Sequence, residues 1–170
     1  MSGTNEKVWT LIDRTVIASA VQTYDFAPTI AVSGNVDLAY WIVGFVKNDN
    51  AGTAEIGLRL NTAAIACDRQ RFNASSTTLT AARDTTTTFA SVPTTKSVSF
   101  CCWMLKTATG DIRHAIISSA LDSSTSIQYE NYAVSITTPA TSANITSVGI
   151  GSSVTSGLGV GTELNLFTLR

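Results

Sequence analysis

The chain has 170 residues, a formal net charge of −1 and only 14% charged residues, against about 25% in an ordinary soluble domain. This length is typical of one domain with its own core, and the balanced charge excludes a broad electrostatic contact with nucleic acid or an anionic membrane. Since 44% of the residues are hydrophobic, an intrinsically disordered chain is excluded as well. We therefore expect a single domain over residues 1–170, with residues 1–7 as an N-terminal arm.

The first third of the chain predicts strands joined by polar turns. Strands are expected at residues 8–12 and 14–26, with an acidic turn at Asp13 between them. Residues 36–46 are apolar on both faces, so this strand should be covered by the core on one side and by something else, such as a neighbouring subunit, on the other. Residues 53–60 alternate between apolar and polar, which predicts a strand with one buried and one wet face.

The rest of the chain contains one unusual segment and several further strands. Residues 73–95 are dominated by Ser and Thr, so we expect a surface loop or insertion there; the alternative is a β-prone strand or arm that becomes ordered on a partner. No window has a convincing helical stripe. The remaining strands are predicted at 97–106, 112–121, 127–136, 144–150 and 162–169. The expected fold is all-β, an antiparallel two-sheet sandwich of jelly-roll type with very little helix.

The three cysteines, Cys67, Cys101 and Cys102, form neither a disulfide framework nor a zinc pattern. Adjacent residues of a strand point to opposite faces, so one of Cys101 and Cys102 should be in the core and the other should face outward. We expect free thiols in a reducing cytoplasm. The alternative is a disulfide between subunits through the outward cysteine.

The sequence contains no recognisable catalytic centre. His114 is the only histidine, and its own strand brings no nucleophile beside it. The run Asn48-Asp49-Asn50 has the oxygens of a calcium site, but three adjacent loop residues are more often a turn. We expect no catalytic, cofactor-binding or metal-binding residue, no cofactor and no enzymatic activity. A glycan hydrolase or lyase with two carboxylates brought together in space is the enzymatic alternative.

The three tryptophans, Trp9, Trp41 and Trp103, each lie within a predicted strand at a plausible core position. We expect them in the core or in an interface, because a buried indole contributes a large apolar area. The alternative is a sugar-binding platform, since each ring has a flat apolar face.

Several of these strand patterns resemble those of a group of tailed-bacteriophage virion proteins. Residues 53–61 (TAEIGLRLN) resemble the "lRfN" strand of that group. Residues 145–150 and 161–169 together resemble its closing pattern, "I-t-x-I-x-L … GS-x-x-x-L-Y-x-L". Here Thr162 and Phe167 stand for the Ser and Tyr of that pattern, and the group's "N-G-D" after the arginine strand is absent.

The resemblance covers nearly the whole chain except residues 67–95, and it carries over no catalytic residue. It implies a jelly-roll subunit of a virion, commonly trimeric, displayed on the capsid or at the tail. We therefore expect a non-enzymatic structural virion protein, a capsid decoration or short head-fibre subunit. Its expected partners are its own copies in a homotrimer and another virion protein such as the major capsid protein.

The alternative function is a tail-tip receptor- or carbohydrate-binding module of the same fold. It would bind a host-surface glycan through loop residues around Tyr129, Asn131 and Tyr132. The N-terminus has no apolar segment of the signal-peptide kind, and the longest apolar run, residues 38–46, is too short for a membrane helix. We expect assembly in the host cytoplasm, with neither a membrane nor nucleic acid as a partner.

Overall fold

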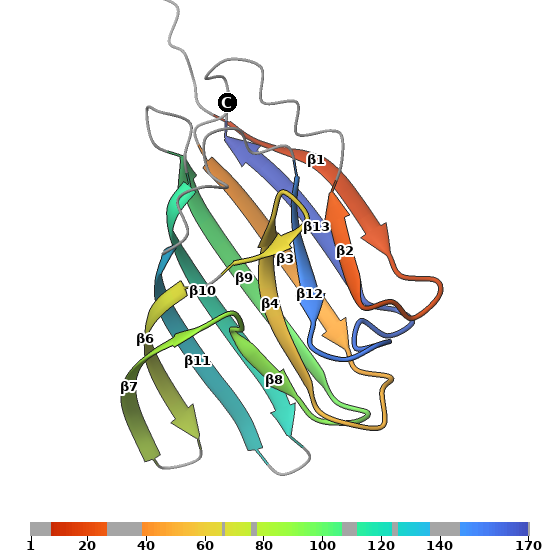
Figure 1. Cartoon of the computed structure of the whole chain (residues 1–170), viewed down its shortest axis with the longest axis vertical. Coiled ribbons are helices and arrows are strands. Elements are labelled where there is room, and N and C mark those ends of the chain that lie inside the picture. Colours follow the sequence, from red (N-terminus) through yellow and green to blue (C-terminus); the bar gives the residue numbers. More distant parts are fainter. Residues whose placement is uncertain are drawn as a thin grey trace, which may run out of the picture.

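The computed structural model describes residues 8–26, 39–65, 67–75, 78–106, 112–123, 126–136 and 147–169, and in these residues the chain forms two antiparallel sheets and no helix (Figure 1). The eight strands of the larger sheet are, in spatial order, β1 (Trp9–Val16), β13 (Glu163–Leu169), β3 (Ala39–Lys47), β9 (Ser97–Lys106), β10 (Ile112–Ser123), β11 (Ser126–Ile136), β6 (Cys67–Ser75) and β7 (Thr78–Thr86). The smaller sheet consists of β2 (Thr23–Phe26), β12 (Val148–Ser152), β4 (Ala54–Leu60) and β5 (Ala63–Ala64), with β8 (Ala90–Val92) paired to β4. The expected all-β sandwich is confirmed.

The core lies between the two sheets and is built from the inward residues of alternating strands. In β4 the inward residues are at most 3% exposed, as the alternation over residues 53–60 predicts. They are Ala54, Ile56, Leu58 and Leu60. On the facing sheet, Gly44 of β3 leaves the space that the ring of Phe100 occupies, because an added Cβ would lie 2.3 Å from the Cε1 atom of that ring.

The predicted strand boundaries near the N-terminus are wrong. No turn occurs at Asp13, because β1 continues to Val16 with a bulge between Leu11 and Asp13. A bulge takes up an extra residue without ending the pairing. The break comes later, in residues 17–22, which lead from the larger sheet to β2 of the smaller one.

The prediction of a surface loop over residues 73–95 is also wrong for the described part of that segment. It contains the end of β6 and the whole of β7 and β8. An edge strand needs backbone pairing on one side only, and the branched Cβ of threonine favours an extended backbone, so few apolar anchors suffice. One such anchor is Phe89, which is 2% exposed and joins the core immediately before β8.

Some expectations fall outside the described residues. They concern the arm of residues 1–7, the start of the strand predicted from residue 36, and residues 144–146 of the strand that continues as β12.

Three strands of the larger sheet continue sideways past the smaller sheet. β8 packs against β9 and β10, whereas β11, β6 and β7 follow one another beyond it at the side of the molecule (Figure 1). We call these three strands the extension. β7 is its last strand and therefore one edge of the larger sheet.

Candidate functional site

The three tryptophans gather on the outer face of the larger sheet and not in the core. Trp41 of β3 lies in register with Trp103 of β9 on one side and with Phe167 of β13 on the other. Leu11 of β1 is in register with Phe167 and lengthens this row to four strands. Of the two expected places, core or interface, the core is excluded, because the neighbours of Trp41 in the chain, Tyr40 and Ile42, are the ones that face inward.

The rings of this row pack against one another. Trp41 and Trp103 are stacked, with ring centroids 4.5 Å apart and an interplanar angle of 15°. Trp9 lies nearly perpendicular to both, with centroids 5.8 Å from Trp41 and 5.1 Å from Trp103. Phe167 contacts Trp41 from the other side at 5.2 Å. Since the flat surfaces of the pair face each other, the cluster is not a row of coplanar rings open to a ligand.

Small neighbours make this packing possible. By alternation Ala39 points to the same side as Trp41, yet it is only 2% exposed. Trp9 comes from β1, two strands away, and reaches over the Leu169–Ala39 pair to meet the stacked indoles. The short side chain of Ala39 therefore leaves the space that the tryptophan rings occupy.

Cys101 is part of the same face. The Nε1–H of Trp41 donates a hydrogen bond to the Sγ atom of Cys101 at 2.7 Å. Cys101 is half-buried and Cys102 is fully buried in the core, and neither forms a disulfide. The prediction that these two cysteines face opposite sides of a strand is confirmed. The side chain of Cys67 lies outside the described part of the structure.

Exposed apolar side chains surround the tryptophans. Leu105 is 66% exposed, Leu11 49%, Phe45 43% and Trp103 36%. With about 200 Å² for a large side chain, these four present roughly 400 Å² of apolar surface. That lies within the range of the largest patch on a typical monomer, which is often functional. We call this surface, together with Trp9, Trp41 and Phe167, the tryptophan face.

Charged groups mark one end of the tryptophan face. Arg14 of β1 pairs with Glu163 of β13 at 2.9 Å, and Glu163 is in register with Phe45. Both charged side chains are well exposed, so the pair contributes little to stability. An apolar centre beside a polar, solvated rim is the usual arrangement of a protein–protein interface.

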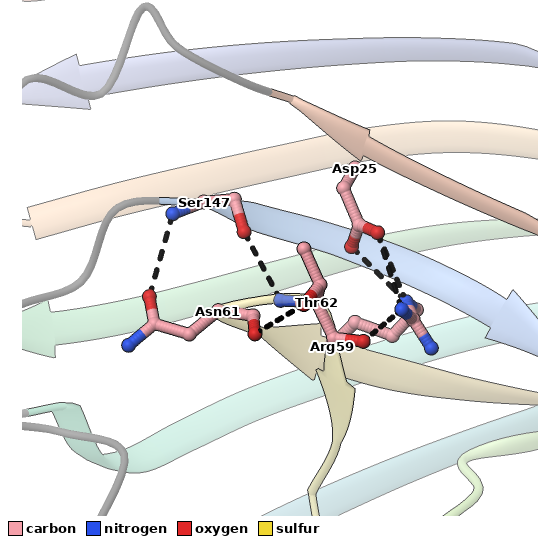
Figure 2. A network of polar contacts seen from close by, with 5 residues as sticks. All are labelled: Asp25, Arg59, Asn61, Thr62 and Ser147. Atoms are coloured by element: carbon pink, nitrogen blue, oxygen red, sulfur yellow. Dashed lines mark hydrogen bonds and ion pairs between the residues drawn. The ribbon is translucent and has the colours of Figure 1, made fainter.

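The outer face of the smaller sheet is polar and glycine-rich. Gly149 of β12 lies in register between Asp25 of β2 and Arg59 of β4. Because glycine has no side chain, the guanidinium of Arg59 crosses the middle strand and meets Asp25, with Nε 3.0 Å from Oδ1 (Figure 2). Both side chains are 16% exposed.

The same arginine holds the turn that follows β4. Its guanidinium also donates to the backbone carbonyl of Thr62, and the N–H of Thr62 donates to Oγ of Ser147 at 3.1 Å (Figure 2). Thr62 has a φ of 66°, which is unfavourable for a β-branched residue. The contacts with Arg59 and Ser147 therefore stabilise an otherwise disfavoured turn.

A groove of about 250 Å³ lies beside Arg59 on this face. Gly57 and Gly151 lie in its floor, and the side chains of Glu55, Arg59 and Ser153 are among its lining. Glu55 accepts a hydrogen bond from Ser91 at 2.6 Å. The lining thus includes hydroxyl, carboxylate and guanidinium groups, which are the kinds of group that proteins use to bind small polar ligands.

The calcium alternative at residues 48–50 does not fit the geometry. Asn48 is fully buried, and its amide binds backbone groups of the turn and of Val92. Asp49 accepts from the N–H of Val160 at 2.6 Å and pairs with Lys47. These side chains hold the turn itself. Across the described residues, no group of three or more His, Cys, Asp or Glu side chains is placed to hold a metal ion.

The remaining sequence candidates lie on two neighbouring strands of the larger sheet. His114 lies in β10. Tyr129, Asn131 and Tyr132 lie within β11 and not on a loop, so the loop placement expected for a receptor site is wrong. The side chains of these four residues are outside the described part of the structure.

Comparison of the chain with protein-family models, with curated proteins and with solved structures finds no match. In the described part of the chain there is no helix with the length and apolar character needed to span a membrane.

Proposed function

We propose that this protein is a non-enzymatic structural subunit of a virion, a capsid decoration or short head-fibre protein, and that it self-associates through the tryptophan face. The observation that supports this most is the exposed apolar surface around Trp103 and Leu105 on an otherwise well-packed sandwich. The virion setting is supported by the strand patterns of residues 53–61 and 161–169. A homotrimer is the form that this resemblance implies.

The area of the tryptophan face is consistent with association. Covering roughly 400 Å² of apolar surface on each copy contributes about 10 kcal/mol per copy. The cost of association is about 4–15 kcal/mol, before side chains are ordered. The stacked indoles are already held by their neighbours, so ordering them costs little more. The apolar contribution and the cost are of similar size, so the packing and the polar contacts at the rim decide the affinity.

Oligomerisation is tested by light scattering and analytical ultracentrifugation over a concentration series. We expect the protein to have three times its chain mass of 17.9 kDa. Leu105→Glu should give a monomer, because it places a charge in the apolar contact; since Leu105 is 66% exposed, the fold itself should survive. Val160→Glu is the matched control, at a 49% exposed position in the turn before β13, outside the residues that define the tryptophan face.

Labelling of Cys101 gives a second readout. If the tryptophan face is covered, thiol reagents should react with Cys101 more slowly as the concentration rises, and Leu105→Glu should restore the fast reaction. A wild-type chain that stays monomeric at every concentration, or equal dissociation by both glutamate variants, would contradict the proposal. Antibody labelling of purified virus particles tests the virion setting. Absence of this protein from the particles would contradict that setting.

The second candidate is a tail-tip module that binds a receptor or glycan. The observation that favours it is the polar groove beside Arg59, whose lining includes Glu55 and Ser153. It predicts retention on glycan arrays that Glu55→Gln abolishes without changing the oligomeric state. Label at the tail and not on the capsid would favour this candidate over decoration.

A further inference from the structure

β7 is a long edge strand whose own sequence has few of the features that usually protect such an edge. Its nine residues, Thr78–Thr86, pair with β6 without a register shift, so no bulge twists the strand away. It contains no proline, and its only charged residues are Arg83 and Asp84. Natural proteins usually protect such edges with prolines, bulges or several charges, because the free N–H and C=O groups of an edge recruit another strand.

The fold places β7 at the border of the larger sheet. It ends the extension, the part of the larger sheet that continues beyond the smaller one (Figure 1). Leu79 of β7 is 73% exposed and Phe72 of β6 is 50% exposed. In the described part of the chain β7 pairs with β6 alone. A strand added to β7 would continue the sheet and cover part of the apolar surface that Leu79 and Phe72 expose.

We propose that two copies of the chain join by pairing their β7 edges, antiparallel about a two-fold axis, into one continuous sheet. This contact is distinct from the tryptophan face and goes beyond the function proposed above. We infer that the added strand comes from a second copy, because β7 can pair antiparallel with another β7 over its whole length without placing like charges opposite each other.

Symmetry restricts the possible registers. A two-fold axis perpendicular to the sheet keeps each residue on its own face, and residues directly opposite each other in a sheet share a face. The axis must therefore pass through a pair of identical residues. At Arg83 or Asp84 it would place two like charges opposite each other, which is destabilising.

An axis through Ala82, the middle residue of Thr78–Thr86, avoids this conflict and pairs the whole strand. It places Asp84 opposite Thr80 of the other copy and Arg83 opposite Ala81. In such a pair the hydroxyl of Thr80 is a donor and the carboxylate of Asp84 an acceptor. The axis position at Ala82 thus combines the longest overlap with no opposition of like charges.

Disulfide cross-linking tests this register directly. In antiparallel strands, directly opposite residues have Cα atoms about 4.5–5.5 Å apart, which suits a disulfide. Ala82→Cys should therefore form a covalent dimer under mild oxidation. Thr80→Cys is the matched control, because in this register the two copies of residue 80 lie about 14 Å apart along the strands. Both variants are made with Cys67 and Cys101 replaced by serine and Leu105 replaced by glutamate, which removes the tryptophan-face contact.

We expect Ala82→Cys to cross-link at least tenfold faster than Thr80→Cys. Equal rates, or cross-linking of neither variant, would overturn the proposal. The cross-linking rate does not depend on the tryptophan-face contact, which Leu105→Glu removes. A failure of the β7 pairing can therefore be distinguished from a failure of the proposed function.

Charge variants at Thr80 give a second test that needs no cysteine. Thr80 is exposed, and its partner in β6, Asn73, is neutral. Thr80→Lys should strengthen the self-association of the Leu105→Glu protein about 2- to 30-fold, because it creates two Lys–Asp84 pairs per dimer. Thr80→Asp should weaken it by a similar factor. The same change in affinity for both variants would overturn the register.

Discussion

Asn48 is the residue whose replacement tests most directly how the turn after β3 is held. Its side chain is fully buried and makes three hydrogen bonds to the backbone. Nδ2 donates to the carbonyl oxygens of Gly52 and Val92, each at 2.8 Å, and Oδ1 accepts from the N–H of Asn50 at 2.8 Å. One asparagine thus joins the β3–β4 turn to β8.

The cost of Asn48→Ala follows from these contacts. The carbonyl of Val92 is buried, and a buried polar group that loses its partner costs about 1–3 kcal/mol. The other two contacts are part-buried and contribute about 0.5–1 kcal/mol each. We expect a loss of about 3 kcal/mol in the free energy of unfolding. For a chain of this size that lowers Tm by about 6–12 °C.

The assay is thermal and urea unfolding of the wild type, Asn48→Ala and Asn50→Ala. Asn50 is the matched control: it is the same residue type in the same turn, but its bonds to Thr155 and Gly52 are exposed. It should lose about 0.5–1 kcal/mol. If Asn48→Ala were no more destabilising than Asn50→Ala, the reasoning from burial would be refuted. A rise in Tm with calcium that Asn48→Ala removes would restore the metal interpretation of this turn.

Two further predictions concern glycine packing and pH. Gly149→Ala should lower stability more than an ordinary exposed strand substitution, because its Cβ would lie 2.2 Å from the carbonyl oxygen of Tyr24 and 2.6 Å from Oδ1 of Asp25. Both β2 and the Asp25 carboxylate would have to move away from Arg59. Urea unfolding of Gly149→Ala, Arg59→Met and the double variant measures this, and losses that simply add would count against a shared cause. The hydrogen bond from the N–H of Val160 lowers the pKa of Asp49, so this group stabilises the fold above its unfolded pKa of about 3.9. That stabilisation disappears as the pH falls through the lowered folded-state pKa, and the gap between wild type and Asp49→Asn should close there.

Periodicity predicted the strands that line the core. Residues 53–60 alternate strictly, and β4 buries the predicted face. The same rule separated Cys101 from Cys102. These predictions succeed because a strand with one buried face has apolar and polar residues in alternation along its sequence.

The sequence did not predict strands whose stability comes from pairing alone. β7 has few apolar residues, so no alternation of apolar and polar residues marks it as a strand. It is held by backbone pairing with β6, which in turn pairs with β11. Similarly, Asp13 indicated a turn, while a bulge beside it lets β1 continue. In both cases the deciding contact comes from a strand that is distant in the sequence.

The sequence left open whether the tryptophans lie in the core or on an outer face. Large aromatic residues are usually assigned to the core, since burial is where they contribute most. Whether Trp41 faces in or out is decided by its strand neighbours, because Tyr40 and Ile42 already fill the inward positions. The signal was present in the doubly apolar run of residues 36–46, which requires cover on both faces.

The two outer faces of the sandwich differ in a way that bears on assembly. On the smaller sheet the outward positions are glycines and charged groups paired within the chain, such as Arg59 with Asp25, and such a face needs no partner to be stable in water. On the larger sheet the outward positions around Trp103 and Leu105 are apolar and partly exposed. Since both faces belong to one small domain with only 14% charged residues, the contrast is not a general shortage of polar surface. The apolar positions are concentrated on one sheet, as expected where a second copy covers that side only.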